Sequence, residues 1–239
     1  MSYGKDVCVV CAFLIGAWMV AVMGSPDSGT GNSPEYLSSA KIKVPVMNGT
    51  KSAQLVNASV FLMPGTGRVL VDIGDAYVDE YKAQPMIKGA VAAAEKVTGI
   101  SLDESDIVIS FDCGGAAIKG DSMGAAVACG IAAAAMNKEI VSSVAITGAI
   151  RRDGRIMSAG KILDKAKALK DGGVETFLVP AGNAIEVNYT EKKVCSDDTG
   201  CRGVVEKEEI DVGQEAGINV VEVANLEDAL RHMLRDRVG

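Results

Sequence analysis

Short β-rich runs alternate with apolar stretches at helical spacing along most of the chain. Strands that alternate with helices predict an α/β (α+β) fold, in which helices cover at least one face of a sheet. No internal repeat is visible, so we expect one compact domain over residues 40–239. Residues 43–63 contain alternating β-rich segments, and further strands are expected at 68–73, 106–111, 140–147, 174–179 and 218–223. The expected helices are 86–97, 122–136, 160–170 and 226–234.

Turn signals divide these elements. Pro64-Gly65-Thr66-Gly67 predicts a turn that joins its two flanking strands as a hairpin. Gly172-Gly173 should end the helix before it, because the left-handed backbone at a helix C-terminus favours glycine. Residues 181–217 are polar and poorly periodic, which predicts a surface excursion that contains a helix.

The N-terminal region has a different character. Residues 7–23 form a run without a charge, near the lower length limit for spanning a bilayer. Lys5 precedes the run and no Lys or Arg follows until Lys41, so the positive-inside bias would place the domain outside the cytoplasm. We expect residues 1–24 to be a transmembrane anchor, or a signal segment whose cleavage releases the domain; a buried core helix is a further alternative. The Gly/Ser/Pro-rich residues 25–39 would then be a flexible linker.

Charge and cysteine content narrow the set of partners. The net charge of −7 argues against nucleic acid, because phosphate binding needs a basic face. The six cysteines do not predict a metal site, since four ligands at suitable spacing are missing, and we expect no cofactor. If the domain lies outside the cell, Cys195 and Cys201 could form a disulfide.

One serine and one lysine carry the candidate chemistry. Ser122 follows Gly120 and Asp121 at a turn that opens an Ala-rich helix. Backbone N–H groups at a helix start have no helical acceptor, so they could stabilise an oxyanion or be capped by a side chain such as that of Ser122. A nucleophilic serine needs a base, and the one histidine, His232, lies late in the chain beside arginines. A Ser-His-Asp triad is therefore not expected, and Lys165 is the remaining candidate base.

A lysine can act as a base only when its amine is neutral. Lowering its pKa from about 10.4 to about 7–8 requires about 4 kcal/mol, which burial without a fixed carboxylate partner can supply. Ile162, Lys165 and Leu169 follow helical spacing and can share one apolar face, whereas Lys167 and Lys170 fall on other faces. The plain alternatives are that the serine only caps its helix and that the lysine is a surface charge.

Two stretches match a known family: GDSMGAAVACGIAAAA and VAITGAIRRDGRIMSAGKILDKAKALKDGGVETFLVP resemble the proteolytic domain of the Lon proteases. That family has a Gly-(Pro/Asp)-Ser-(Ala/Met)-Gly motif, a Thr-Gly-Glu-Ile strand end and a Gly-Gly-Leu-Lys-Glu-Lys segment. The intervals run without gaps from Ser122 to Lys165, and the clear match covers about residues 106–180. The resemblance implies the Lon catalytic-domain fold, related to domain 2 of ribosomal protein S5.

The resemblance also implies roles for individual residues. Ser122 would be the nucleophile, Lys165 the general base and Thr147 a hydroxyl that helps hold the lysine, with Gly120 and Asp121 in support. Two positions depart from the family pattern: Ala149 replaces the usual Glu and Lys161 replaces the second Gly. No G-x-x-x-x-G-K-[ST] phosphate-binding motif occurs, so we expect ATP-independent hydrolysis of polypeptide substrates. Relatives form hexameric rings, which makes a homo-oligomer possible.

Three other functions are alternatives on the sequence alone. An inactive Lon-like domain would bind peptides or partners at the membrane. Signal peptidases also use a serine and a lysine and begin their motif with Ser-Met, but Pro-Thr follows there in a β-rich domain. Small-molecule kinases of the galactokinase–homoserine kinase type have a related fold, but their Gly-Leu-Gly-Ser-Ser-Ala run is not present.

Overall fold

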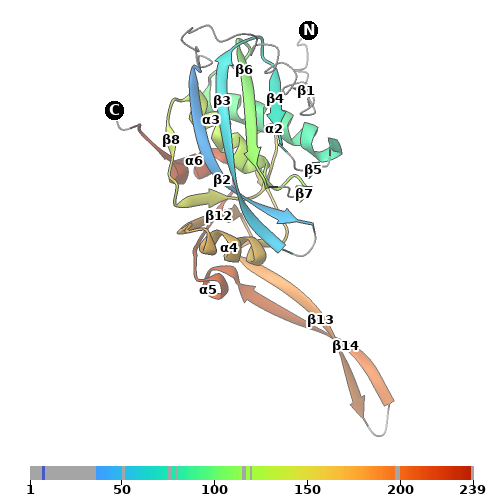
Figure 1. Cartoon of the computed structure of the whole chain (residues 1–239). Coiled ribbons are helices and arrows are strands. Elements are labelled where there is room, and N and C mark those ends of the chain that lie inside the picture. Colours follow the sequence, from blue (N-terminus) through green and yellow to red (C-terminus); the bar gives the residue numbers. More distant parts are fainter. Residues whose placement is uncertain are drawn as a thin grey trace.

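A mixed seven-stranded sheet forms the larger part of the fold (Figure 1). The computed structural model describes residues 7–8, 36–49, 52–74, 77–78, 80–114, 117–118, 120–196 and 200–237. The two central strands pair antiparallel with each other, and the outer strands extend the sheet on both sides. In spatial order the strands are β1 (Val7–Cys8), β4 (Val69–Asp72), β6 (Ser105–Asp112), β3 (Ser52–Pro64), β2 (Ser38–Asn48), β7 (Ala117–Ile118) and β5 (Tyr77–Val78).

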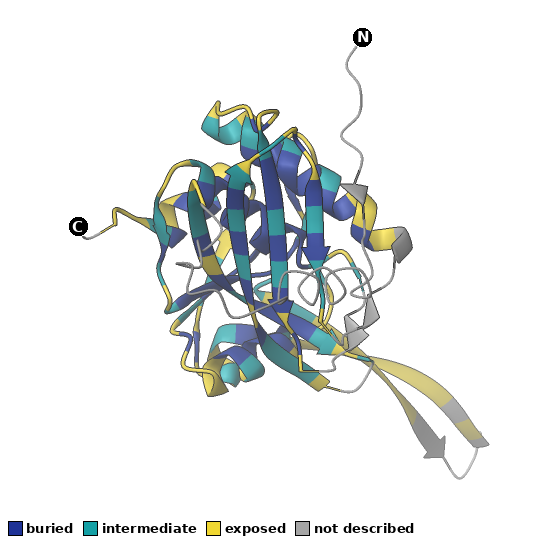
Figure 2. Cartoon of the chain, turned by 45° about the horizontal axis from the view of Figure 1, so that its top comes forward, coloured by how far each residue is buried: buried dark blue, intermediate teal, exposed yellow. Residues whose placement is uncertain are grey.

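Two helices, α2 (Glu80–Thr98) and α3 (Gly124–Ala135), cover one face of this sheet (Figure 1). Buried and partly exposed residues alternate along the strands, and the buried set faces the helices (Figure 2). Every residue of α3 from Gly124 to Ala134 is buried. Its small Ala and Gly side chains let its backbone approach the sheet closely: a Cβ atom at Gly130 would lie 2.9 Å from Val60.

A second layer holds a three-stranded parallel sheet of β9 (Val144–Ile146), β12 (Thr176–Pro180) and β15 (Asn219–Val223). The helices α4 (Ile162–Asp171) and α5 (Val212–Ala216) pack with this sheet around a small core of their own. The last helix, α6 (Leu226–Met233), packs against α3 and joins the two layers. Two short pairs complete the body: β8 (Glu139–Ile140) with β16 (Leu234–Arg235), and β10 (Ala149–Ile150) with β11 (Ile156–Met157).

The polar segment 181–217 contains a long hairpin. Its strands, β13 (Ile185–Ser196) and β14 (Gly200–Asp211), project away from the body (Figure 1). The predicted surface excursion and its helix, which is α5, are confirmed, but the sequence pattern missed both strands. Cys195 and Cys201 are partners in the hairpin register, and Cys201 is disulfide-bonded.

The predicted hairpin across 64–67 is wrong. β6 lies between β3 and β4 and pairs with both of them, antiparallel to β3 and parallel to β4. The apolar centre of β6 allows it to occupy this internal position, which sequence neighbours alone do not reveal. Asp106 instead fixes the 64–67 turn, because its carboxylate accepts hydrogen bonds from the backbone N–H groups of Thr66 and Arg68. The actual hairpin of the sheet is β2–β3, whose turn contains Gly49 at φ +67°.

The predicted membrane segment lies almost wholly outside the described residues. The first two residues of the uncharged run, Val7 and Cys8, form β1 beside β4, and residues 1–6 and 9–35 are not described. Within the described residues, no helix combines the length and apolarity needed to cross a membrane. β2 begins at Ser38, just before residue 40, and the predicted domain boundaries stay a prediction.

Candidate active site

Ser122 and Lys165 meet in the structure. The Nζ atom of Lys165 donates hydrogen bonds to Oγ of Ser122 at 2.9 Å and to Oγ1 of Thr147 at 3.0 Å. Oγ1 of Thr147 in turn donates to the backbone carbonyl of Ser122 at 3.1 Å. The three residues predicted to act together therefore form one closed set of contacts.

The turn before α3 places the serine. Gly120 has φ +95°, a backbone conformation that favours glycine, and α3 begins at Gly124. The N-cap residue is Met123, and no side chain caps the helix, so the interpretation of Ser122 as a helix cap is wrong. The hydroxyl of Ser122 is directed to the lysine instead, and the serine is half-buried.

The strand end after β9 holds the other side of the site. The N–H of Gly148 donates to the carbonyl of Ser122 at 2.7 Å, and the N–H of Ala125 donates back to the carbonyl of Gly148 at 2.9 Å. Gly148 has φ +145°, and a Cβ atom there would lie 2.5 Å from Ile156. A glycine is therefore required next to Thr147, and the Thr-Gly pair locks the serine turn onto the parallel sheet.

Lys165 lies on the buried face of α4, as its helical spacing predicted. Ile162 and Leu169 are buried beside it, while Lys167 and Lys170 are exposed. The lysine side chain is only 1 % exposed. The interpretation of Lys165 as a surface charge is therefore wrong.

Burial determines the protonation of this lysine. Removal from water lowers the pKa of Lys165 from 10.5 to about 8, and the charges of Asp121 and Glu186 act in the opposite direction. No carboxylate of the described residues forms an ion pair with the amine. Near neutral pH a useful fraction of Lys165 is thus neutral, which is the form that can accept a proton.

Comparison with known protein families and proteins assigns the chain to a family. The model of the Lon protease (S16) C-terminal proteolytic domain matches residues 47–211, well over half of the chain. The chain belongs to the Lon protease family. It is 29 % identical over 123 residues to the Lon protease of Paraburkholderia phytofirmans, a match that covers 51 % of this chain and 15 % of that protein.

Two other relatives match the chain at similar levels. The archaeal Lon protease of Methanocaldococcus jannaschii is 33 % identical over 92 residues, which is 38 % of this chain and 14 % of that protein. Lon protease 2 of Bacillus subtilis is 33 % identical over 105 residues, which is 43 % of this chain and 19 % of that protein. The chain spans less than a fifth of the length of each of these relatives.

The two departures from the Lon pattern have clear positions in the fold. Lys161 is the N-cap of α4 and has φ +59°, a left-handed conformation that a glycine at this family position adopts without strain. Ala149 begins β10 and is half-buried. The amine of Lys165 donates to Ser122 and Thr147, so these contacts are formed without either residue.

Sequence reasoning did not single out Glu186, which contacts the helix of the lysine. Its Oε2 atom accepts a hydrogen bond from the backbone N–H of Leu163 at 2.8 Å, in the first turn of α4. This carboxylate satisfies one of the free N–H groups at the helix start. Glu186 lies 21 positions after Lys165 (186 − 165), on β13, and only the fold brings the two elements together.

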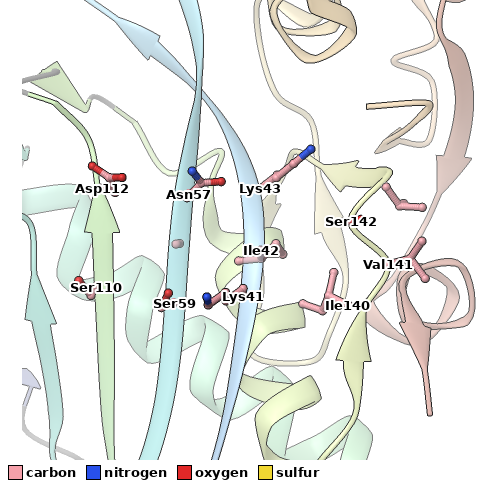
Figure 3. A pocket seen from close by; sticks show the side chains of 12 residues that line it. Lys41, Ile42, Lys43, Asn57, Ser59, Ser110, Asp112, Ile140, Val141 and Ser142 are labelled. Carbon is pink, nitrogen blue, oxygen red and sulfur yellow. The ribbon is translucent and has the colours of Figure 1, made fainter. Parts of the chain in front are cut away.

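A separate pocket lies on the open face of the large sheet (Figure 3). It has a volume of about 470 Å³, and β2, β3, β6 and the segment around β8 line it. Lys41 and Lys43 line the pocket from β2, and Asp112 lies on β6 on the opposite side (Figure 3). The Nζ atom of Lys43 donates to the backbone carbonyl of Gly172 at 3.3 Å. Neither Ser122 nor Lys165 lines this pocket, so it is distinct from the serine–lysine site.

Other reactive groups of the described chain do not form a competing site. Burial raises the pKa of the Cys129 thiol to about 12, which keeps it protonated and a poor nucleophile. Among the described residues, no group of three or more His, Cys, Asp and Glu side chains could hold a metal ion.

Proposed function

We propose that this chain is a serine-type endopeptidase that hydrolyses peptide bonds with Ser122 as nucleophile and Lys165 as general base. The single observation that carries the proposal is the 2.9 Å contact between Lys165 Nζ and Ser122 Oγ, made by an amine that is almost completely buried. Membership of the Lon family supports the same chemistry.

The acylation step moves one proton twice. Neutral Lys165 accepts the hydroxyl proton of Ser122 while Oγ bonds to the carbonyl carbon of the substrate, which gives a tetrahedral oxyanion. The protonated amine then donates that proton to the leaving nitrogen, the C–N bond breaks, and an ester on Ser122 remains. Water completes the cycle: Lys165 takes a proton from water while the water oxygen attacks the ester. Lys165 then returns that proton to Oγ of Ser122 as the ester C–O bond breaks, which frees the serine, the neutral amine and the second product.

Thr147 positions the amine for this transfer. Its hydroxyl proton is directed to the carbonyl of Ser122, so its oxygen is an acceptor for Lys165. A neutral amine has two protons and one lone pair. With one proton donated to Thr147, the lone pair can face the hydroxyl of Ser122, which is the orientation that general-base catalysis requires.

The proposals on ATP independence, membrane anchoring, substrates and self-association rest on the sequence. Hydrolysis without ATP is proposed because the chain has no phosphate-binding motif. Membrane anchoring through residues 1–24, with the domain outside the cytoplasm or secreted after cleavage, is proposed from the uncharged run and the positions of Lys and Arg. Polypeptides are the proposed substrates, and self-association into a homo-oligomer remains part of the proposal.

Covalent labelling tests the proposal. A fluorophosphonate should modify the purified protein on the Ser122 peptide, as located by mass spectrometry, and Ser122→Ala should abolish the label. Lys165→Ala should reduce the labelling rate by at least about 100-fold, whereas Lys167→Ala, on the exposed face of the same helix, should leave it unchanged. Equal labelling of wild type and Lys165→Ala would refute the lysine as base. Absence of any label on Ser122 would favour the inactive binding module.

A further inference from the structure

The β13–β14 hairpin carries exposed apolar side chains on one of its two faces. Ile185, Val187 and Tyr189 alternate along β13, so they share a face. Val205 lies on the same face, because its register partner, Glu191, continues this series. Tyr189 is 70 % exposed and Val205 59 %. We call Ile185, Val187, Tyr189 and Val205 the apolar stripe.

The described part of the chain leaves this stripe uncovered. Within the described residues, β13 and β14 pair only with each other, and the hairpin extends beyond the body (Figure 1). The outer edge of β13 therefore presents backbone groups that have no partner in a sheet. A two-stranded ribbon is only marginally stable in water, and apolar side chains beside a free strand edge are typical of a surface that binds another chain.

The base of the hairpin adjoins the catalytic pair. Glu186, the second residue of β13, binds the N–H of Leu163 in the turn of α4 that precedes Lys165. The side chain of Asn183 accepts a hydrogen bond from the N–H of Ala159 at 3.4 Å, which fixes the chain just before β13. From this anchored base, residues 185–189 extend the stripe outward by about 14 Å, at about 3.4 Å per residue.

We propose that the hairpin is a docking arm for the polypeptide that is to be cleaved. This inference rests on the proposed function. An extended segment adds as a third strand along the free edge of β13, and its apolar side chains contact the apolar stripe. Backbone hydrogen bonds to a strand edge accept any extended sequence, and the stripe selects the apolar segments that unfolded proteins expose.

The connection to the catalytic helix favours a substrate over a second copy of this chain. β13 is bonded at its base to the helix that carries Lys165, and Lys165 contacts Ser122, so a strand paired along β13 has one end near the catalytic helix. The charged residues on the stripe's face include an ion pair, Lys207 with Glu209, whose charges cancel. The stripe thus selects for apolar character and extension rather than for a charged partner.

Two matched double variants test the docking arm in the full chain with Ser122→Ala, so that bound polypeptide is not cleaved. The probe is fluorescently labelled, reduced and carboxymethylated α-lactalbumin, an unfolded protein, and the measurement is its Kd by fluorescence anisotropy. Tyr189→Ser with Val205→Ser, which changes the stripe, should raise the Kd about tenfold, a loss of about 1.4 kcal/mol. Thr190→Ser with Val204→Ser changes the opposite face of the same strands and should stay within about twofold.

The outcomes separate this inference from the proposed function. An unchanged Kd in the stripe variant overturns the docking arm. Loss of self-association in the same variant, measured by sedimentation velocity, overturns it too, because the stripe would then contact a second copy. As an independent measurement, a benzoylphenylalanine photocrosslinker should capture the probe from position 189 and not from position 190, and the reverse result contradicts the proposal. Fluorophosphonate labelling of Ser122 in the active chain reports on the proposed function alone, and the stripe substitutions should not change its rate.

Discussion

Replacement of Lys165 by methionine should remove a pH-dependent penalty on stability. Methionine fills a similar volume with an apolar side chain, so the variant keeps the packing of α4 and loses the buried amine. In wild type, burial lowers the pKa of Lys165 from 10.5 to about 8. The unfolded chain therefore binds more protons than the folded chain between these two pH values, and the free energy of unfolding rises with pH in that window.

The size of the effect follows from the pKa shift. At 1.36 kcal/mol per unit, the shift corresponds to about 3 kcal/mol in all, of which about 2–3 kcal/mol is expressed between pH 7 and pH 10. Well below pH 8 the amine is charged in both states and the burial penalty is present in full. The difference in stability between wild type and Lys165→Met should thus move by about 2–3 kcal/mol in favour of wild type as the pH rises from 7 to 10.

Urea unfolding at a series of pH values measures this difference. Subtraction of the two curves removes the titration of all other groups, and Lys167→Met, at an exposed position of α4, provides a control that keeps the buried amine of Lys165. A difference between wild type and Lys165→Met that stays constant from pH 7 to pH 10 would refute a buried lysine with a lowered pKa.

Three further substitutions probe the site. Thr147→Val removes the hydroxyl that accepts from the Lys165 amine, so kcat should fall about 10–100-fold with little change in KM. Thr147→Ser should retain most activity. A change in KM alone would contradict the positioning role of Thr147. Glu186→Gln keeps the hydrogen-bond acceptor but removes a charge that raises the pKa of Lys165. The midpoint of the pH–rate profile should therefore fall below about 8. Glu186→Asp should shift this midpoint less, and a rise of the midpoint in Glu186→Gln would contradict the effect of the Glu186 charge. Gly148→Ala should destabilise the fold by about 2–4 kcal/mol in chemical denaturation, because φ is +145° and the new Cβ atom would meet Ile156. An unchanged denaturant midpoint of unfolding would contradict this requirement for glycine.

The positions of Ser122 and Lys165 could be predicted because their signals are local. The turn before Ser122 and the buried face of α4 are each encoded within about ten residues, by glycine positions and helical periodicity. The contact between them needed the family resemblance, because no local pattern specifies how α3 and α4 approach. Thr147 was likewise predicted from the family motif, and the structure shows the physical reason: its hydroxyl bonds both partners.

Other features depend on contacts between distant segments and could not be predicted from local patterns. β6 separates β3 from β4, although the turn at 64–67 suggested a direct hairpin. The long β13–β14 hairpin was missed because apolar and polar residues alternate only over residues 185–189, while the rest of both strands is rich in charged and polar residues without a sustained alternation. Glu186 accepts the hydrogen bond from Leu163 only because the base of this hairpin lies beside the start of α4.

The rate of Ser122 labelling as a function of pH tests whether a buried, neutral Lys165 is the base for Ser122. A fluorophosphonate reacts with the serine when its base is neutral, so the account predicts a rate that rises with pH and levels off, with a midpoint near pH 8. The same midpoint should disappear in Lys165→Ala. A midpoint near the ordinary lysine value of 10.5, or one that persists after Lys165 is removed, would contradict a buried neutral amine as the base for Ser122.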